Sequence, residues 1–281
     1  MPSPPTILVF DSGLGGLTVY REVSAARPDA RFVYAADDAF FPYGDHAEPQ
    51  LIARVLAVME NLIADVRPEL IVIACNTAST LVLPHLRKKF SLPFVGTVPA
   101  IKPACASSKS RLVSVLGTEA TVAREYTHAL IRDFSQGCAV TLVGSRRLAK
   151  MAEDDLNGHT VADADILAEI RPCFVTASGA RTDTIVLACT HYPLLLDRLK
   201  KLAPWPVEWI DPAPAIARRV IELLGPPAST DPAPPARLIL TSGRTSSPAL
   251  KAVLARFGIS DNATSLTPSP GPPKYRPSRG P

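Results

Sequence analysis

The chain has 281 residues, of which 47% are hydrophobic and 20% charged, with a formal net charge of +4. This composition is typical of a globular protein with a sizeable core, and no basic run interleaved with aromatic residues indicates a nucleic-acid partner. No apolar run approaches the roughly 20 residues of a membrane span and no signal peptide is visible, so we expect a cytoplasmic protein without a membrane partner.

The expected elements alternate between strands and helices. In the first part of the chain they are a strand at 6–10, a helix to about 26, a strand at 31–36, a loop at 37–48, a helix at 49–66, a strand at 71–73, a helix to about 90 and a strand at 93–95. Apolar residues at helical spacing support the helix at 49–66, and short β-branched runs support the strands.

Near Thr97 the pattern starts again. It comprises a strand at 111–116, a helix to about 134, a strand at 138–143, helices at 146–156 and 163–177, a strand at 185–187 and a helix at 194–202. A helix at 212–224 then returns to the first half, and a strand at 237–241 and a helix at 248–257 follow a proline-rich linker.

Alternating strands and helices predict an α/β fold with two similar halves, each a mostly parallel sheet flanked by helices. We expect one domain at 1–97 with 207–260 and a second at 98–206. The segment 261–281 is rich in proline, serine and glycine and almost free of aliphatic residues, which predicts a disordered tail.

One short sequence motif occurs twice. Cys75 and Cys189 each follow a buried strand and Ala, and each is followed by two polar residues before the next helix. Open α/β sheets bind ligands at such strand ends, and a helix N-terminus favours a thiolate. The alternatives are two buried structural cysteines or a disulfide. The odd total of 5 cysteines, without a CxxC motif, argues against a disulfide framework and against a zinc site.

Two thiols on opposite sides of a carbon suit the inversion of a stereocentre, because one takes a proton while the other gives one. Asp11 ends the first strand and is either a helix cap or a carboxylate that acts on Cys75. His191 is either structural or an acid–base partner of Cys189.

The glycine-rich turn at 13–16 offers backbone N–H groups to an anion. Short polar residues at strand ends suit binding of carboxylates and an amine, or act only as caps; they are Ser12, Asn76, Thr77, Thr118, Thr121 and Thr190.

Together these motifs resemble those of glutamate racemases, which belong to the cofactor-independent aspartate/glutamate racemase superfamily. The matching stretches, in family order, are Phe10–Gly16, Pro42–Gly44, Ala74–Ser79, Gly117–Thr118 with Thr121, and Leu187–Leu194. The resemblance covers about residues 7 to 224. It implies two pseudo-symmetric domains with the active site in the cleft between them, and interconversion of L- and D-glutamate without a cofactor or a metal.

The resemblance also implies residue roles. Cys75 would take the α-proton of D-glutamate and Cys189 that of L-glutamate, assisted by Asp11 and His191 respectively. Substrate contacts would come from Ser12, Tyr43, Gly44, Asn76, Thr77, Thr118, Thr121 and Thr190. Glu153 stands where the family has a glutamate that supports the second thiol, although its basic, helix-like surroundings depart from the family pattern and equally suit a solvated helix face.

We therefore expect a racemase that supplies D-glutamate for peptidoglycan synthesis and forms a homodimer. Two alternatives stay open at this point. One is an aspartate racemase or another enzyme with the same thiol pair, and the other is a non-catalytic amino-acid-binding regulator.

Overall fold

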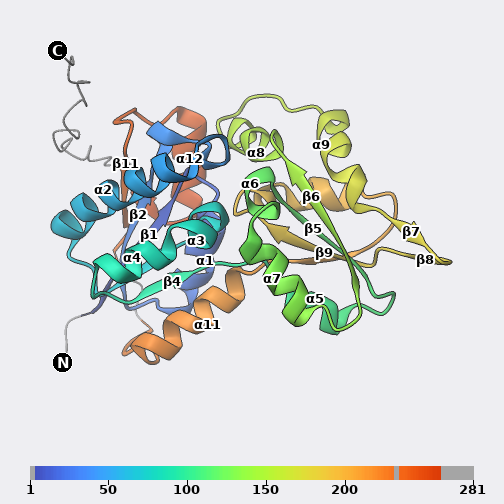
Figure 1. The fold of residues 1–281 in the computed structure, drawn as a ribbon. Coiled ribbons are helices and arrows are strands. Elements are labelled where there is room, and N and C mark those ends of the chain that lie inside the picture. The colour runs from blue at the N-terminus through green and yellow to red at the C-terminus, as the bar shows by residue number, and fades with distance from the viewer. Residues whose placement is uncertain (1–3, 231–233, 261–281) are drawn as a thin grey trace, which may run out of the picture.

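A computed structural model describes residues 4–230 and 234–260 and shows the predicted α/β fold. Two sheets with their flanking helices form two lobes that lie side by side (Figure 1). The predicted disordered tail at 261–281 lies outside the described residues. Within the described part of the chain, no helix is both long enough and apolar enough to cross a membrane.

The first lobe is built on a six-stranded sheet. Its strands are β1 (Thr6–Asp11), β2 (Arg31–Ala36), β3 (Leu70–Ile73), β4 (Phe94–Gly96), β11 (Ala236–Leu240) and β12 (Ile259–Ser260). They lie in the order β12-β11-β2-β1-β3-β4, and every neighbouring pair is parallel. Strand β3 is buried along its whole length, as expected of a parallel strand covered on both faces.

Helices cover both faces of this sheet. They are α1 (Leu17–Ala26), α2 (Glu48–Val66), α3 (Asn76–Leu81), α4 (Leu83–Lys89), α11 (Ala213–Leu224) and α12 (Pro248–Arg256). One core layer contains side chains of α1, α11 and α12, and the other contains those of α2, α3 and α4. In α2, the residues Leu51, Val55 and Leu62 recur at helical spacing and are fully buried, which stabilises the helix by about 2 kcal/mol per side chain.

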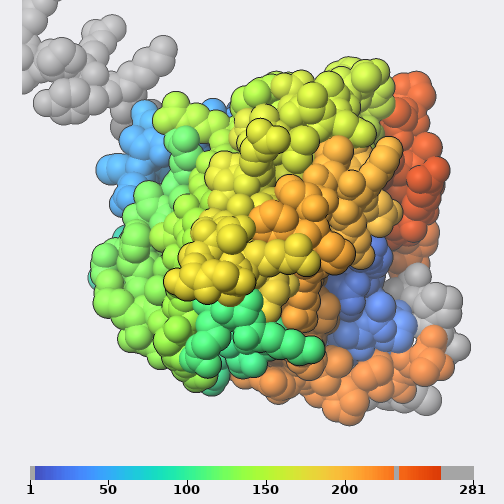
Figure 2. Space-filling model, turned by 90° about the vertical axis from the view of Figure 1, so that its right-hand side faces the viewer, coloured from blue at the N-terminus to red at the C-terminus, as the bar shows by residue number. Residues whose placement is uncertain are grey.

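The second lobe has a four-stranded sheet in the order β10-β9-β5-β6, again with parallel neighbours. The strands are β5 (Leu112–Thr118), β6 (Ala139–Ser145), β9 (Thr184–Ala188) and β10 (Glu208–Ile210). Its helices are α5 (Ile101–Ser107), α6 (Glu119–Val122), α7 (Glu125–Phe134), α8 (Leu148–Leu156), α9 (Asp163–Ile170) and α10 (Leu196–Leu202). Figure 2 views this lobe from its outer side, with the first lobe visible in blue and red at the edges.

The two sheets repeat one topology. The run β2-β1-β3-β4 in the first sheet corresponds to β6-β5-β9-β10 in the second, so β3 and β9 occupy equivalent places. In each sheet the first strand of the repeat, β1 or β5, has the second strand of the repeat on one side and the third on the other, so the strand order reverses there. The carboxyl ends of strands at such a reversal are where open α/β sheets bind ligands, and Cys75 and Cys189 both follow strands at these points.

Several elements differ from the sequence-based expectation. The helix predicted at 163–177 ends at Ile170 and gives way to a 3-10 turn, η3 (Arg171–Cys173), and to an antiparallel hairpin of β7 (Thr176–Ala177) and β8 (Ala180–Arg181). Pro172 has no backbone N–H and so cannot continue the helical hydrogen bonding, and Gly179 supplies a positive φ of 78° at the tip of the hairpin. Strand β10 pairs with β9, so the second sheet extends beyond the expected boundary at residue 206.

Other differences are smaller. Three further 3-10 turns are present, η1 (Asp38–Phe40), η2 (Tyr43–Asp45) and η4 (Tyr192–Leu195), in segments expected to be loop or the start of a helix. The single helices expected before residues 90 and 134 are each divided in two. The predicted return of the chain to the first lobe is seen, because α11 packs along α1.

Candidate active site

The two predicted thiols lie at equivalent strand ends and share one cavity. Cys75 follows β3 and caps the N-terminus of α3, while Cys189 follows β9 and precedes η4. Both are free and buried, with 5% and 6% of their surface exposed. A disulfide between them is absent in this structure. The thiols therefore approach a single space from two different sheets.

That space is a small cavity of about 20 Å³, roughly the room for one water molecule. Among the residues predicted for the site, the cavity wall contains Ser12, Tyr43, Gly44, Cys75, Asn76, Thr77, Thr118, Cys189, Thr190 and His191. Asp11, Thr121 and Glu153 do not line it and contact its wall from behind. A larger cavity of about 480 Å³ shares part of this wall and is also lined by Asp45, Glu119 and Arg146.

Three wall residues were not predicted, namely Phe41, Pro42 and Ala149. The phrase that contains Pro42 was noted in the sequence, and the loop around Phe41 offered a signal in its aromatic and proline content. Phe41 contacts the ring of His191, with the ring centroids 5.2 Å apart. Ala149 gives no sequence signal, because a small apolar residue on a helix is ordinary.

The environment of Cys75 differs from the sequence-based expectation. The start of α3 was expected to favour the thiolate, and the N–H of Ala78 does lower the pKa of Cys75. Burial has a larger effect, and together with the negative charge of Asp11 it raises the pKa well above the usual range. The Cys75 thiol donates to Ser12 Oγ across 3.7 Å. Cys75 is therefore held as a protonated thiol, which suits a proton donor.

Asp11 combines the two roles considered for it. Its Oδ2 accepts a hydrogen bond from the Gly16 N–H at 2.8 Å, next to the first residue of α1. Its carboxylate also accepts from Thr190 Oγ1 at 3.4 Å. Burial raises the pKa of Asp11, while the positive charge of His191 acts in the opposite direction. Asp11 acts on Cys75 through its charge, and its described hydrogen bonds go to Gly16 and Thr190.

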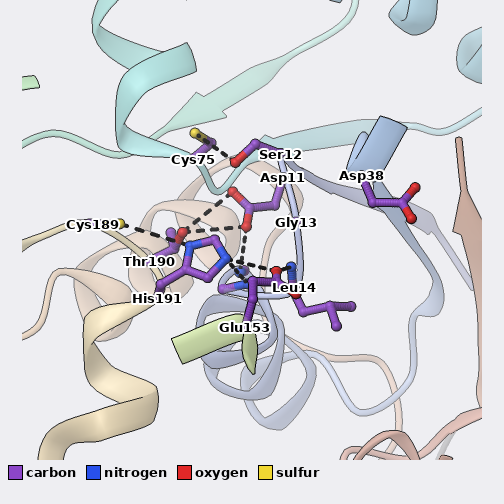
Figure 3. A network of polar contacts seen from close by, with 12 residues as sticks. Asp11, Ser12, Gly13, Leu14, Asp38, Cys75, Glu153, Cys189, Thr190 and His191 are labelled. Carbon is purple, nitrogen blue, oxygen red and sulfur yellow. Dashed lines mark hydrogen bonds and ion pairs between the residues drawn. The ribbon is translucent and has the colours of Figure 1, made fainter. Parts of the chain in front are cut away.

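On the other side of the cavity, Cys189, His191 and Glu153 form a chain (Figure 3). His191 Nδ1 lies 3.9 Å from Cys189 Sγ, and His191 Nε2 lies 2.9 Å from Glu153 Oε1. Burial lowers the pKa of His191, but the contacts with Cys189 and Glu153 outweigh it and raise the pKa well above its usual range. Burial raises the pKa of Glu153, and the hydrogen bond and charge of His191 bring it below its ordinary value. His191 and Glu153 therefore each favour the charged form of the other.

The place of Glu153 corrects one alternative. A solvated helix face was considered for it, but only 7% of the residue is exposed and the side chain points to His191. The hydrophilic neighbours in the sequence, Lys150 and Asp154, pair with each other on the outer face of α8. Consecutive residues of a helix point about 100° apart, so Glu153 faces His191 while its neighbour Asp154 faces outward.

The glycine-rich turn offers its N–H groups to side chains of the protein itself. Two of the three groups that it binds are carboxylates. The N–H of Leu14 donates to Glu153, that of Gly15 to His191 Nε2 at 3.2 Å, and that of Gly16 to Asp11. A Cβ at Gly15 would lie 2.4 Å from His191 Nδ1, so only glycine permits this approach.

Hydroxyl and amide groups complete the wall. Thr77 Oγ1 lies 3.1 Å from Thr118 Oγ1 and 3.2 Å from Thr121 Oγ1, which joins α3 of the first lobe to α6 of the second. Both side-chain polar atoms of Asn76 are buried and have no protein partner among the described residues. A buried amide without partners is costly unless a ligand or water satisfies it. Asn76 is therefore suited to bind a polar group of a ligand.

Tyr43 is held by a buried ion pair that sequence reasoning missed. Its hydroxyl donates to Asp37 Oδ2 at 2.8 Å, and Arg54 contacts the same carboxylate at 2.6 and 3.0 Å. Thr241 Oγ1, at the end of β11, donates to Asp37 Oδ1 at 2.6 Å. Asp37 is fully buried, so this network fixes the position of one wall of the cavity. Within the described ranges, no group of three or more His, Cys, Asp or Glu side chains is placed to hold a metal ion.

Two parallel α/β lobes with paired thiols at equivalent strand ends define a class of enzymes that act on a small molecule held between the lobes. The model of the Asp/Glu/hydantoin racemase family matches residues 16–220. The chain therefore belongs to the Asp/Glu/hydantoin racemase family.

Relatives of known function are similar over most of the chain. The glutamate racemase of Brucella canis is 55% identical over 237 residues, which is 82% of this chain and 85% of the relative. The glutamate racemase of Brucella anthropi is 56% identical over 221 residues, or 78% and 80% of the two chains. Among solved structures, Escherichia coli glutamate racemase in complex with L-glutamate and the activator UDP-MurNAc-Ala has a TM-score of 0.84 and 38% identity, covering 94% of this chain and 98% of its own.

Proposed function

We propose that this protein is a glutamate racemase that interconverts L- and D-glutamate by transfer of the α-proton between Cys75 and Cys189. The observation that carries the proposal is that these two thiols line one cavity from opposite sheets. The relatives named above as glutamate racemases support glutamate as the substrate. An amino-acid-binding regulator would not require two buried thiols, each with its own acid–base neighbour.

In the direction from L- to D-glutamate, the thiolate of Cys189 takes the α-proton and the thiol of Cys75 donates a proton to the opposite face of the carbon. The high pKa of Cys75 keeps its proton available for this step. The ring of His191, whose Nδ1 faces Cys189, stabilises the thiolate before the transfer. In the other direction the two thiols exchange duties, with Asp11 beside Cys75.

The α-proton is weakly acidic, so the site must stabilise the negative charge that develops on the substrate carboxylate. Hydrogen-bond donors in a dry site do this most effectively. The unpartnered amide of Asn76 and the hydroxyls of Thr77 and Thr190 lie in the cavity wall for this purpose. Since the cavity of about 20 Å³ is too small for glutamate, the lobes must separate for the substrate to enter.

We further propose that Ser12, Tyr43, Gly44, Thr118 and Thr121 contribute to substrate binding. We also propose that the enzyme works in the cytoplasm as a homodimer and that its D-glutamate enters peptidoglycan synthesis. The domains proposed are 1–97 with 207–260 and 98–206, except that β10 pairs in the second sheet and is therefore assigned to the second domain.

The proposal is tested by exchange of the α-proton in deuterated water with L- and D-glutamate as separate substrates. We expect racemisation with deuterium appearing in the product enantiomer. Cys75→Ala and Cys189→Ala should each abolish racemisation in both directions, because the equilibrium constant of a racemisation is fixed at one. Near-native turnover in either variant would refute the two-thiol mechanism. Faster turnover of aspartate than of glutamate would refute the substrate assignment.

A further inference from the structure

A second cavity lies next to the acid–base chain of Cys189. It has a volume of about 450 Å³ and contains Glu153 in its wall, together with Asn157 of the segment after α8 and Ser242 and Arg244 of the loop after β11. Phe41 and Pro42 line both this cavity and the catalytic one. His191 lines only the catalytic cavity and Glu153 only the second, so their hydrogen bond joins the two spaces.

The chain of contacts has distances that permit proton transfer. Cys189 Sγ contacts His191 Nδ1 at 3.9 Å, and His191 Nε2 contacts Glu153 Oε1 at 2.9 Å. These atoms are arranged in one line of contacts in Figure 3. Ten per cent of the Glu153 side chain is exposed, against 2% of His191. Of Cys189, His191 and Glu153, it is therefore Glu153 that reaches solvent through the second cavity.

The surroundings of His191 Nε2 suit both of its protonation states. When Nε2 carries a proton, the Glu153 carboxylate accepts it in a hydrogen bond. When Nε2 is bare, the N–H of Gly15 donates to it at 3.2 Å. A ring nitrogen with only an acceptor beside it would lose its partner on deprotonation, at the cost of an unsatisfied buried group. His191 Nε2 therefore has a hydrogen-bond partner in both protonation states, the Glu153 carboxylate in one and the Gly15 N–H in the other. A nitrogen that repeatedly gains and loses a proton requires both.

Cys75 has no equivalent connection in the described structure. Its hydrogen-bond partner is Ser12, which is 95% buried, and the nearby carboxylate of Asp11 is fully buried. Asp11 contacts Gly16 and Thr190 and does not line the second cavity. The two thiols therefore differ in their access to water while the lobes are closed.

We propose that Cys189 gives its proton to bulk water through His191, Glu153 and the second cavity, and that this route resets the Cys189–His191 pair after each conversion of L- to D-glutamate. The Sγ–H bond of Cys189 breaks as an N–H bond forms at His191 Nδ1, and the Nε2–H bond breaks as an O–H bond forms on Glu153. Glu153 then gives this proton to a water molecule of the cavity, and Cys189 is a thiolate again. Cys75, which ends the conversion one proton short, takes up a proton from water when the lobes separate.

Charges around Glu153 support its use as an intermediate carrier. Arg244 lies in the same cavity wall, where it pairs with Asp38 at 2.8 Å. On α8, Lys150 forms an ion pair with Asp154 at 2.6 Å, and His159 Nδ1 lies 3.7 Å from the same carboxylate. The cavity wall is thus polar and nearly balanced in charge, which suits water more than an apolar or strongly charged ligand.

The inference rests on the proposed racemase activity and is tested by closing the cavity. Asn157→Phe places a large apolar side chain beside Glu153, and Asn157→Ala is the matched control, because both lose the hydrogen bond from Asn157 to the Glu153 carbonyl. Ser242→Phe and Ser242→Ala form a second pair on the opposite wall. Progress curves of racemisation at rising glutamate concentration give the rate at which the two free-enzyme forms interconvert, since that step limits turnover when substrate and product are both saturating.

We expect Asn157→Phe to slow this interconversion by about a hundredfold, the low end of what a positioned proton-transfer group contributes, while kcat/KM at low substrate and the Tm stay close to native. Asn157→Ala should keep the native interconversion rate. If the wild type racemises glutamate and both Phe variants fold and interconvert at the native rate, or if the Ala controls are slowed equally, the route is wrong. A wild type without racemisation would instead refute the proposed function and the route with it.

Discussion

The hydroxyl of Thr190 lies 3.4 Å from both carboxylate oxygens of Asp11. Thr190 directly follows Cys189 in the second lobe, whereas Asp11 ends β1 in the first lobe and influences Cys75. A residue adjacent to one thiol thus contacts the carboxylate next to the other. The two halves of the site are therefore connected through these side chains.

Replacement of Asp11 should change the acidity of Cys75. Burial is the main cause of the raised pKa, but the charge of Asp11 raises it further and the hydrogen bond with Ser12 lowers it. We therefore expect Asp11→Asn to lower the pKa of Cys75 and Ser12→Ala to raise it. The rate of Cys75 alkylation by iodoacetamide at pH 9, followed by mass spectrometry of its peptide, should rise in the first variant and fall in the second. Equal shifts in the same direction would contradict this assignment.

Glu153→Gln should lower the pKa of His191, because the hydrogen bond and the charge of Glu153 both raise it. A titration of the His191 ring by NMR would show a lower midpoint in the variant. We also expect kcat/KM to fall by about a hundredfold in both directions alike. An unchanged His191 titration would show that the carboxylate does not control this imidazole.

The same pair makes stability depend on pH. The pKa of His191 is raised above 6.5. Its contribution to the free energy of unfolding is therefore complete below pH 6.5 and is lost as the pH rises through the pKa of the folded state. The pKa of Glu153 is lowered below 4.5, so its contribution is complete above pH 4.5 and is lost as the pH falls through the folded-state value. Wild type should therefore exceed Glu153→Gln in unfolding free energy most clearly between these two values, by about 3 kcal/mol. Urea unfolding at several pH values measures the difference.

Gly15→Ala should inactivate the enzyme without unfolding it. The added methyl group would lie 2.4 Å from His191 Nδ1, so the imidazole must move away from Cys189. A displacement of about 1 Å in a catalytic group costs about a hundredfold in rate. Gly44→Ala is the control for folding, because its methyl group would meet nothing closer than 3.7 Å. Native activity in Gly15→Ala would contradict the assigned role of His191.

Arg54→Met should destabilise the protein by about 3 kcal/mol, because it leaves the carboxylate of Asp37 buried without its partner. The control is Lys89→Met, whose ion pair with Glu60 is exposed and should be worth less than about 1 kcal/mol. Since Asp37 accepts the hydrogen bond of Tyr43, KM for glutamate should also rise in Arg54→Met and stay native in Lys89→Met. Chemical unfolding and steady-state kinetics give both quantities.

The sequence was informative where a local pattern determines structure. Apolar runs located β3 and β9, and the polar residues after them located Cys75 and Cys189 at strand ends. Parallel pairing then brings strand ends to one edge, which explains why so many of the expected side chains share the cavity.

Long-range contacts were not accessible in this way. The orientation of Glu153 depends on the rotation of α8 against η4, and the sequence around it reads equally well as an exposed helix. Ala149 and the pair of Asp37 and Arg54 are ordinary residues until the fold brings them to the cavity. The net acidity of Cys75 follows from burial, which a local motif does not report.

The glycine-rich turn has a consequence for attempts to change the substrate of this enzyme. Its consecutive N–H groups hold Glu153, His191 and Asp11, so a displaced turn would alter the machinery of both thiols at once. Mutant libraries that include this turn should yield mostly inactive enzymes. Ala149 lies in the cavity wall without a role in this set of hydrogen bonds, and it is the better starting position for engineering a preference for shorter or longer amino acids.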